Sequence, residues 1–396
     1  MQQTQPASNR RLPKWVLAVL PLFLLALLII GFLVLNPLSF FAGAFPPLEE
    51  LTIQRVRFPE PNHVDLSVIN GGPDPVSIAQ VIVDDAYWQY EIDADNHVLD
   101  RLEETTIHLQ YPWVDGEPLP IVLVTSTGVT FDFEAEVAVQ SPATGTSTFL
   151  AYGLLGIYVG VIPVVLGMLW FPFMRRMDRK WMNAVFALTI GLLVFLFVDT
   201  VLEALEIAAT MPEVYQGIPV VYLGILLTLG VLLAVGQRGR SESPLSVAFL
   251  IALGIGLHNL GEGLAIGAAF ATGAAALGSF LVVGFTLHNI TEGVGIAAPL
   301  LRGERPSIGI FVALALLAGG PAILGTWIGG FAFSPFLATL FLSIGAGAIL
   351  QVIWEVGKLL VREAQRQERP TFSWLNFGGL TAGILIMYLT AFLVKF

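Results

Sequence analysis

The sequence contains no cysteine, which excludes disulfide scaffolds, thiolate metal sites and thiol nucleophiles. Charge is scarce, because Asp, Glu, Lys and Arg make up only 12% of the 396 residues, against roughly 25% in soluble domains. Basic residues are the scarcer kind, and the net charge of −11 argues against nucleic acid as a partner. Since 55% of the residues are hydrophobic, the chain has too little polar surface for a soluble protein and is predicted to lie in a membrane.

Long apolar runs occur in two parts of the chain. A run of about 18 or more apolar residues is typical of a transmembrane helix. The first, Trp15 to Leu35, exceeds the apolar region of a signal peptide and predicts an uncleaved anchor helix, with cleavage near Ala42 to Ala44 as the alternative. Eight further runs predict a helical core, at residues 148–173, 181–207, 217–236, 245–270, 276–300, 307–331, 335–361 and 374–394.

Residues 45–142 lack such runs and instead alternate apolar with polar side chains. Phe131 to Val137 has the period of two that indicates a half-buried strand, and turn clusters such as Asn70 to Pro75 separate the strands. About a hundred residues of this kind predict an all-β, sandwich-like domain. The domain is acidic, with 18 Asp and Glu against 3 Lys and Arg. Its segment Glu91 to His97 is interpreted as an acidic hairpin turn, with metal capture as the alternative.

Basic residues cluster in alternate loops, which predicts the orientation of the chain. Arg10, Arg11 and Lys14 precede the first apolar run, and the other clusters lie at 175–180, 238–240, 302–305 and 358–369. The positive-inside rule assigns all of them to the cytoplasm if the first run crosses outward. The protein is therefore expected to be multi-pass in the plasma (inner) membrane, with a cytoplasmic N-terminus and an extracytoplasmic C-terminus.

These patterns together predict an all-α polytopic membrane protein with an inserted extracytoplasmic all-β, sandwich-like domain. Residues 1–44 are expected to form the cytoplasmic N-terminus and the anchor helix, residues 45–142 the acidic β-domain, and residues 143–396 an eight-helix core.

Two consecutive predicted helices carry the same polar motif near their middle. Residues 258–263 read His-Asn-Leu-Gly-Glu-Gly and residues 288–293 read His-Asn-Ile-Thr-Glu-Gly. At about 100° per residue, the His, Asn and Glu of one motif share one arc of the helix. A short loop joins the helices, so both motifs are expected at the same depth. The predicted ligands for one divalent ion, of the Zn²⁺ or Fe²⁺ kind, are His258, Asn259, Glu262, His288, Asn289 and Glu292.

The energetic cost of these residues favours a bound metal. A carboxylate in the middle of a bilayer costs several kcal/mol unless it is paired or metal-bound. Neither helix contains a Lys or Arg that could pair with Glu262 or Glu292. The alternative is two protonated glutamates that are hydrogen-bonded to Asn and His across a packed interface.

The duplicated motif resembles that of the ZIP (Zrt/Irt-like) divalent metal transporters, and the second copy is nearest to their broad-specificity bacterial branch. The eight-helix core also resembles that family in helix number and orientation. Residues 197–204 resemble the second-helix segment His-Leu-Leu-Pro-Glu-Ala, with Asp199 where His is common, and residues 345–355 resemble a seventh-helix segment that ends in Glu. The anchor helix and the β-domain are additions that minimal bacterial members lack.

The resemblance implies a secondary transporter that moves divalent metal into the cytoplasm by an elevator-like movement of one helix group against another. Zn²⁺ is the expected cargo, with Fe²⁺, Mn²⁺ and Cd²⁺ as alternatives. The family often has a Glu before a sixth-helix Pro, whereas residues 318–321 read Ala-Gly-Gly-Pro. We therefore expect one tight site from His258, Glu262, His288 and Glu292, with both asparagines as weaker ligands.

Further polar residues are candidates for the transport path. Asp199, Glu203 and Glu206 follow helical spacing and could line an entrance, or they could be a solvated helix end. Gln351 and Glu355 could line an exit, although Glu355 and Lys358 could be a plain intrahelical pair.

The expected partners are divalent metal ions and the lipid bilayer. The sequence decides neither whether the protein forms a homodimer nor which partner the β-domain binds. No catalytic residue or prosthetic group is expected. The competing functions are an intramembrane metal-dependent hydrolase and a metal sensor that signals through the anchor helix.

Overall fold

The computed structural model describes residues 14–35, 47–93, 97–135, 137–238, 243–272, 274–301 and 305–394. The chain forms two compact units, Met1–Leu48 and Glu49–Phe396. The first contains helix α1 (Lys14–Leu35), which matches the expected anchor run and carries Pro21 inside it. The predicted domain boundary at residue 44, the alternative cleavage site near Ala42 and the basic residues Arg10 and Arg11 lie outside the described residues.

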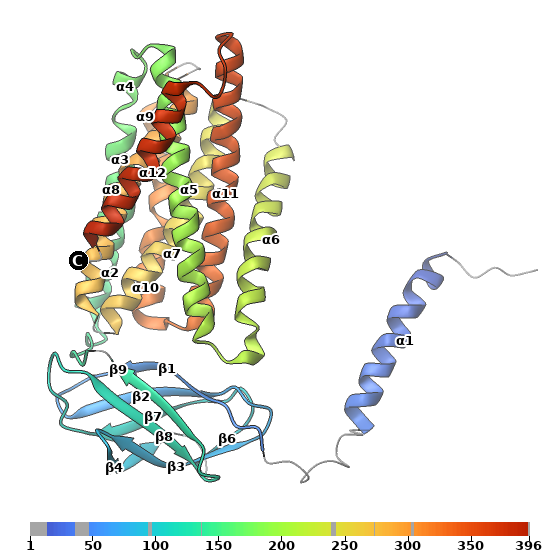
Figure 1. Ribbon diagram of the computed structural model, residues 1–396, viewed down its shortest axis with the longest axis vertical. Coiled ribbons are helices and arrows are strands. Elements are labelled where there is room, and N and C mark those ends of the chain that lie inside the picture. Colours follow the sequence, from blue (N-terminus) through green and yellow to red (C-terminus); the bar gives the residue numbers. More distant parts are fainter. Residues whose placement is uncertain are drawn as a thin grey trace, which may run out of the picture. The chain divides into compact units, whose positions relative to one another are not determined.

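The second unit begins with a β-domain that consists of two antiparallel sheets (Figure 1). The first sheet has the order β1-β2-β7-β5, and the second has the order β4-β3-β8-β9, with β6 paired to β3. The strands are β1 (Leu51–Arg57), β2 (His63–Asn70), β3 (Val76–Val83), β4 (Ala86–Trp88), β5 (Tyr90–Ile92), β6 (Val98–Leu99), β7 (Glu104–Gln110), β8 (Leu119–Thr125) and β9 (Thr130–Ala135).

Alternation of apolar and polar side chains gives the β-domain its core. In β2, Val64 and Leu66 are buried while Asp65 between them is partly exposed, and β7 repeats this pattern with Ile107 and Leu109 around His108. The buried residues of both sheets pack into one apolar cluster. The prediction of a separate β-sheet region is confirmed.

Helices make up the rest of the unit (Figure 1). They are α2 (Thr146–Gly156), the π-helical turn η3 (Ile157–Val161), α3 (Ile162–Met168), α4 (Phe171–Met174), α5 (Arg179–Ala209), the 3-10 turn η4 (Glu213–Tyr215), α6 (Gly217–Arg238), α7 (Pro244–Ala271), α8 (Ala275–Leu300), α9 (Ile308–Gly319), α10 (Pro321–Ala332), α11 (Pro335–Arg366) and α12 (Trp374–Val394).

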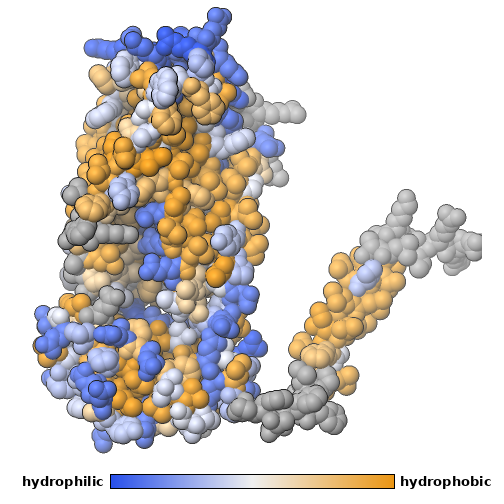
Figure 2. All heavy atoms as spheres, in the orientation of Figure 1, coloured by the Kyte–Doolittle hydropathy of each residue, from blue (hydrophilic) through white to orange (hydrophobic). Residues whose placement is uncertain are grey.

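Seven helical stretches among the described residues are long and apolar enough to cross a membrane. They correspond to the first seven of the eight predicted core runs, so the class of multi-pass helical membrane protein is confirmed. The eighth run forms α12, whose apolar part, Trp374–Leu389, is shorter than the other seven. The complete eight-helix core therefore stays a prediction. Apolar residues also cover much of the surface of the helical part (Figure 2).

Local sequence signals explain where several of these helices begin. The hydroxyl of Ser243 accepts a hydrogen bond from the backbone N–H of Ser246, and Pro244 occupies the first turn of α7. Ser334 and Pro335 do the same at the start of α11. These caps satisfy backbone donors that have no partner within their own helix.

Two of the predicted runs are not regular helices. The run 148–173 is interrupted by the π-helical turn η3, and the run 307–331 is divided into α9 and α10. Pro163 follows the first interruption and Gly319-Gly320-Pro321 forms the second, because a proline inside a helix removes a backbone donor. The two irregular regions lie against each other, since a Cβ on Gly160 would overlap the backbone of Gly319.

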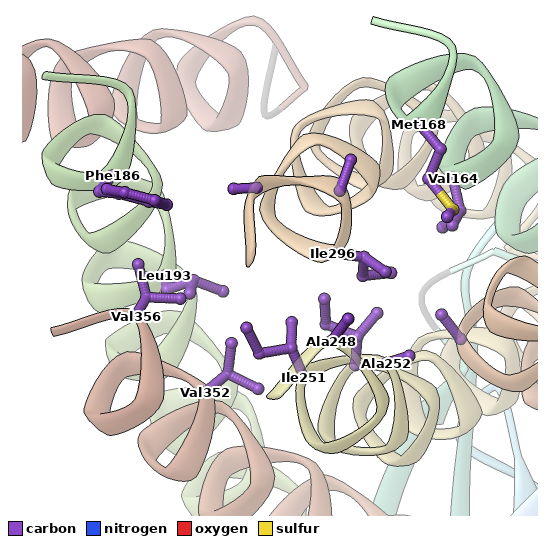
Figure 3. Packing of buried hydrophobic residues seen from close by; sticks show 14 of the residues in the cluster. Val164, Met168, Phe186, Leu193, Ala248, Ile251, Ala252, Ile296, Val352 and Val356 are labelled. Carbon is purple, nitrogen blue, oxygen red and sulfur yellow. The ribbon is translucent and has the colours of Figure 1, made fainter. Parts of the chain in front are cut away.

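Helix α7 lies at the centre of the helical part and contacts α8, α9, α10 and α11. A large apolar cluster fills the space between α3, α5, α7, α8 and α11, with Ile251, Ile296 and Val352 among its buried members (Figure 3). Close backbone approach at the glycines of both motifs is also present. A Cβ on Gly263 would overlap Ala322 of α10, and one on Gly293 would overlap Val164 of α3, whereas Gly261 has ordinary contacts.

Candidate metal centre

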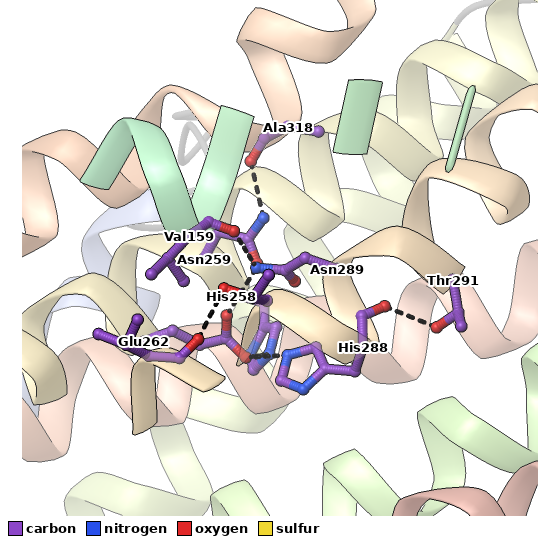
Figure 4. A network of polar contacts seen from close by, with 10 residues as sticks. Val159, His258, Asn259, Glu262, His288, Asn289, Thr291 and Ala318 are labelled. Carbon is purple, nitrogen blue, oxygen red and sulfur yellow. Dashed lines mark hydrogen bonds and ion pairs between the residues drawn. The ribbon is translucent and has the colours of Figure 1, made fainter. Parts of the chain in front are cut away.

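His258, Glu262 and His288 converge between α7 and α8, near the middle of both helices (Figure 4). Each offers one ligand atom, and these atoms lie within 4.8 Å of one another. The Nε2 atom of His258 is 2.8 Å from Oε1 of Glu262, and Nε2 of His288 is hydrogen-bonded to the same oxygen. This is a group that could hold a metal ion, in a region with almost no contact with solvent.

The local sequence explains this convergence. His258 and Glu262 are four residues apart, so their side chains lie on one face of α7. Helix α8 follows α7 in the chain and packs against it, which brings His288 opposite this face. The two imidazole rings lie with their centroids 6.2 Å apart. The spacing that the sequence shows is thus enough to bring three of the predicted ligands together.

Both asparagines are tied to the irregular parts of neighbouring helices. The Nδ2 group of Asn289 donates to the carbonyl of Val159 in η3, at 3.0 Å, and also to Oε2 of Glu262 in the cluster, at 3.3 Å. That carbonyl lies four residues before Pro163, which has no N–H to offer it. The Nδ2 group of Asn259 likewise donates to the carbonyl of Ala318, at 3.0 Å, in the last turn of α9. Each asparagine therefore fixes α7 or α8 against an interrupted helix.

These bonds also determine where the side-chain oxygens point. An amide presents its Oδ1 on the side away from its Nδ2, so each oxygen is directed away from the carbonyl that the Nδ2 binds. The Oδ1 atoms of Asn259 and Asn289 are buried and have no hydrogen-bond partner among the described residues. Two oriented acceptors without a donor can serve as oxygen ligands for a cation.

Glu292 adds a carboxylate to the same region. It is buried, and neither of its oxygens has a hydrogen-bond partner among the described residues. His258, His288 and Glu262 lie close enough to interact with its charge, and so does the side chain of Asn259. A cavity of about 10 Å³ borders His288 and Glu292 and is otherwise lined mostly by apolar side chains such as Leu193. A buried carboxylate without a partner is costly, and a bound cation would offset that cost.

The cluster is closed on all sides. The exposed fractions are 2% for His258, 2% for Glu262, 5% for His288 and 3% for Glu292. A cation held there would have no free exchange with solvent, so it could arrive or leave only after the surrounding helices move.

The predicted entrance residues lie on α5 at different depths. Asp199 and Glu206 are exposed, whereas Glu203 is half-buried. Glu203 interacts electrostatically with Asp199 on its own helix and with Glu262 and His258 of the cluster. Asp199 lies one turn nearer the middle of α5 and interacts with the charge of His288, so the structure brings both acids near the cluster. Glu206 lies closer to the C-terminal end of α5.

The predicted exit residues lie on α11. Gln351 is buried, and neither polar atom of its side chain has a partner among the described residues. Its Oε1 would be 3.1 Å from a Cβ on Gly254, one helical turn before His258 in α7. Glu355 accepts a hydrogen bond from Nζ of Lys358 at 2.7 Å, so the plain intrahelical pair is present.

The carbonyls of Val159 and Ala318, which accept hydrogen bonds from the two asparagines, were not predicted from the sequence. Their signals were the proline and the Gly-Gly-Pro stretch inside apolar runs, since interrupted helices often expose carbonyls at binding sites in transporters. No protein-family model and no curated protein matches this sequence. Fold and site by themselves define the class: a multi-pass helical membrane protein with a β-sheet domain and a buried His/Glu group that could hold a metal ion.

Proposed function

We propose that this protein is a secondary transporter of the ZIP type, which moves divalent transition metal ions, Zn²⁺ first among them, into the cytoplasm. The observation that carries the proposal is the convergence of His258, Glu262 and His288 inside a bundle of apolar helices. Nitrogen and oxygen ligands without sulfur suit Zn²⁺, Fe²⁺, Mn²⁺ and Cd²⁺. The ligand set therefore supports divalent transition metals as a class and does not distinguish one of them from the others.

The cargo ion would replace protons in the cluster. His258 and His288 now share Oε1 of Glu262, and a metal ion needs the lone pairs and the negative charge that these bonds occupy. Glu292 would complete a set of two imidazoles and two carboxylates, with the oxygens of Asn259 and Asn289 as weaker ligands. Binding would release protons, and release of the metal would take them up again. An inside-negative membrane potential would add about 2.3 kcal/mol per charge per 100 mV to inward movement.

The closed cluster supports alternating access rather than an open pore. Glycine contacts and asparagine bonds join α7 and α8 to the interrupted helices α3, α9 and α10. A second group is formed by α5, α6, α11 and α12, in which α11 contacts α5 and α6, and α12 contacts α5. Movement of the first group against the second would expose the cluster toward Asp199 and Glu203 on one side and toward Gln351 and Glu355 on the other.

Burial favours transport over an intramembrane hydrolase. A hydrolytic metal site keeps one coordination position open for water and must admit its substrate. None of the three converging residues is more than 5% exposed, and the adjoining cavity holds about 10 Å³. We therefore propose that the protein is not an enzyme. By the positive-inside rule, its β-domain and C-terminus would be extracytoplasmic in the plasma (inner) membrane.

Proteoliposomes that enclose a metal-sensitive dye test the proposal. We expect Zn²⁺ influx in the wild-type protein and its loss in His258→Gln and in His288→Gln. His63→Gln is the matched control, because it removes an exposed imidazole from the β-domain. Influx that survives both membrane substitutions would refute the proposal, and tight Zn²⁺ binding without influx would favour a sensor or an enzyme.

A further inference from the structure

The five histidines of the chain fall into two groups. Two belong to the group of His258, Glu262 and His288, called the membrane cluster below. The other three, His63, His97 and His108, line one surface groove of about 1080 Å³ on the β-domain. Aromatic side chains and Glu91 line the same groove. Three histidines from separate parts of an acidic domain thus share one surface.

Strand register puts acidic residues on both sides of His108. His108 lies on β7, opposite Asp65 of β2 and opposite Glu91 of β5. Paired residues in an antiparallel sheet project from the same face, so these three side chains form a row across the sheet. Asp93 follows β5 directly, and its Oδ2 atom is 3.3 Å from Nε2 of His108.

The two ring nitrogens of His108 have different environments. Nδ1 is 2.8 Å from Oδ1 of Asp65, which is the less exposed of its two acidic partners. A carboxylate on one nitrogen fixes the ring and makes the other nitrogen a better metal ligand, as in the carboxylate–histidine–zinc arrangement of metal sites. The distance of 3.3 Å from Nε2 to Asp93 also matches the spacing of two ligands in a tetrahedral site. Ligands at about 2.0–2.1 Å from Zn²⁺ lie about 3.3 Å apart in that geometry.

We propose that the β-domain has its own site for a divalent transition metal ion, with His108, Asp93 and Glu91 as ligands and Asp65 as the positioning residue for the His108 ring. The membrane cluster is the one set of three His or acidic ligand atoms within 4.8 Å of one another among the described residues, so the third ligand of this site has to move in. Glu91 can do so, because it is exposed and lies beside His108 in the sheet. The segment interpreted from the sequence as an acidic hairpin turn thus supplies ligands at its start, while its residues 94–96 lie outside the described residues.

The site would bind metal whether or not the protein transports it. Only its role as an external capture site for cargo rests on the proposed function and on the predicted orientation. A surface site of three ligands, one of which has to move, is expected to bind more weakly than a preformed buried cluster.

Metal binding by the full-length protein in detergent tests the proposal. Metal binding by the membrane cluster is first removed with His258→Gln and His288→Gln. In this variant, Zn²⁺ binding is measured by equilibrium dialysis and Co²⁺ binding by its visible absorption. We expect one ion per chain, with an affinity that falls at least tenfold in His108→Gln and in Asp93→Asn. Asp65→Asn should reduce the affinity by roughly 10–100-fold without abolishing binding.

His63→Gln is the matched control, since it removes another imidazole from the same groove and should leave the affinity unchanged. Asp93 is exposed, so its substitution keeps the test valid even if His108→Gln fails to fold. The absence of a bound ion, or equal affinity in the Asp93→Asn variant, would overturn the proposal. Because the readout is binding by a protein with a silenced membrane cluster, failure here and failure of influx in proteoliposomes are separate results.

Discussion

The protein contains two groups of histidine and carboxylate side chains, and they differ in their exposure to solvent. In the membrane cluster, His288 and Glu262 have side chains that are 5% and 3% exposed. In the β-domain, the side chain of His108 is 42% exposed, and those of Asp65 and Asp93 are 24% and 67% exposed. Similar hydrogen bonds therefore have different consequences, because water can replace a lost partner at the surface but not between α7 and α8. The contrast predicts that substitutions have large effects in the first group and small ones in the second.

The largest difference is expected at Glu292, whose buried carboxylate has no hydrogen-bond partner among the described residues. Glu292→Gln should abolish metal influx in proteoliposomes, because the cation loses a charged ligand. In metal-free detergent solution it should raise the unfolding temperature by the equivalent of about 1–3 kcal/mol, because it replaces a buried charge with a neutral side chain of the same shape. Asp93→Asn in the β-domain is the exposed counterpart and should leave the unfolding temperature nearly unchanged. A lower unfolding temperature in Glu292→Gln would contradict the expectation that this buried carboxylate destabilises the metal-free protein.

A smaller effect on metal influx is expected from the buried asparagines, which occur in both regions. Asn70 of the β-domain donates to the carbonyls of Asp74 and Leu99 and accepts from the N–H of Gly72, so both polar atoms of its side chain have partners within the fold. Asn289 donates to Val159 and to Glu262, but its Oδ1 has no hydrogen-bond partner among the described residues. Each Asn→Leu substitution should destabilise the protein by about 1–3 kcal/mol, because buried groups lose their partners.

A transport assay should distinguish the substitutions at these two asparagines. In proteoliposomes that contain equal amounts of folded protein, Asn289→Leu should weaken Zn²⁺ influx, and Asn70→Leu should leave it unchanged. Equal influx in both variants would show that Asn289 acts only as a structural tie between α8 and η3.

The smallest effect is expected at His108, and it depends on pH. Its hydrogen bond to Asp65 raises the pKa of His108 above the ordinary value near 6.5, against the opposing effect of burial and with Asp93 adding to the rise. A raised pKa in the folded state means that the stabilisation is fully present below about pH 6.5 and is lost as the pH rises through the folded value. Because His108 and Asp93 are exposed, the contribution should stay below about 1 kcal/mol.

Thermal unfolding in the presence of a chelator checks this expectation. The wild-type protein should lose slightly more stability between pH 5.5 and pH 8 than His108→Gln does. Asp65, Asp93 and Glu91 are the acidic groups beside the ring on the neighbouring strands, and Asp65→Asn should remove most of the difference. Identical pH profiles in all three proteins would show that the ion pairs contribute nothing measurable.

Much of this architecture could be predicted from the sequence because it depends on short-range patterns. Runs of apolar residues mark the seven spans, and alternation marks the strands. The convergence of His258, Glu262 and His288 follows from helical spacing and a short connection, which are also local.

Features that depend on distant parts of the chain could not be predicted. The carbonyl of Val159 is 130 residues from Asn289, and Asp65 is 43 residues from His108. Nothing in the motifs indicated that an interrupted helix would orient Asn289, or that strand register would bring Asp65 and Glu91 to His108. The irregularity of the first and sixth spans also escaped the hydropathy pattern, because a single proline or a glycine pair barely changes the mean hydropathy of a long run.

If the cluster binds a cation, the bond between Asn289 and Val159 would link metal binding to the stiffness of the helix bundle. A cation at Oδ1 draws electron density from the amide, which makes the N–H groups on the other side stronger donors. The bond to Val159 would then shorten as the ion arrives, and Asn259 would respond in the same way toward Ala318. Metal binding would thus hold both interrupted spans more firmly against α7 and α8, so that these spans and the two helices would move together as one rigid group with metal bound and less rigidly without it.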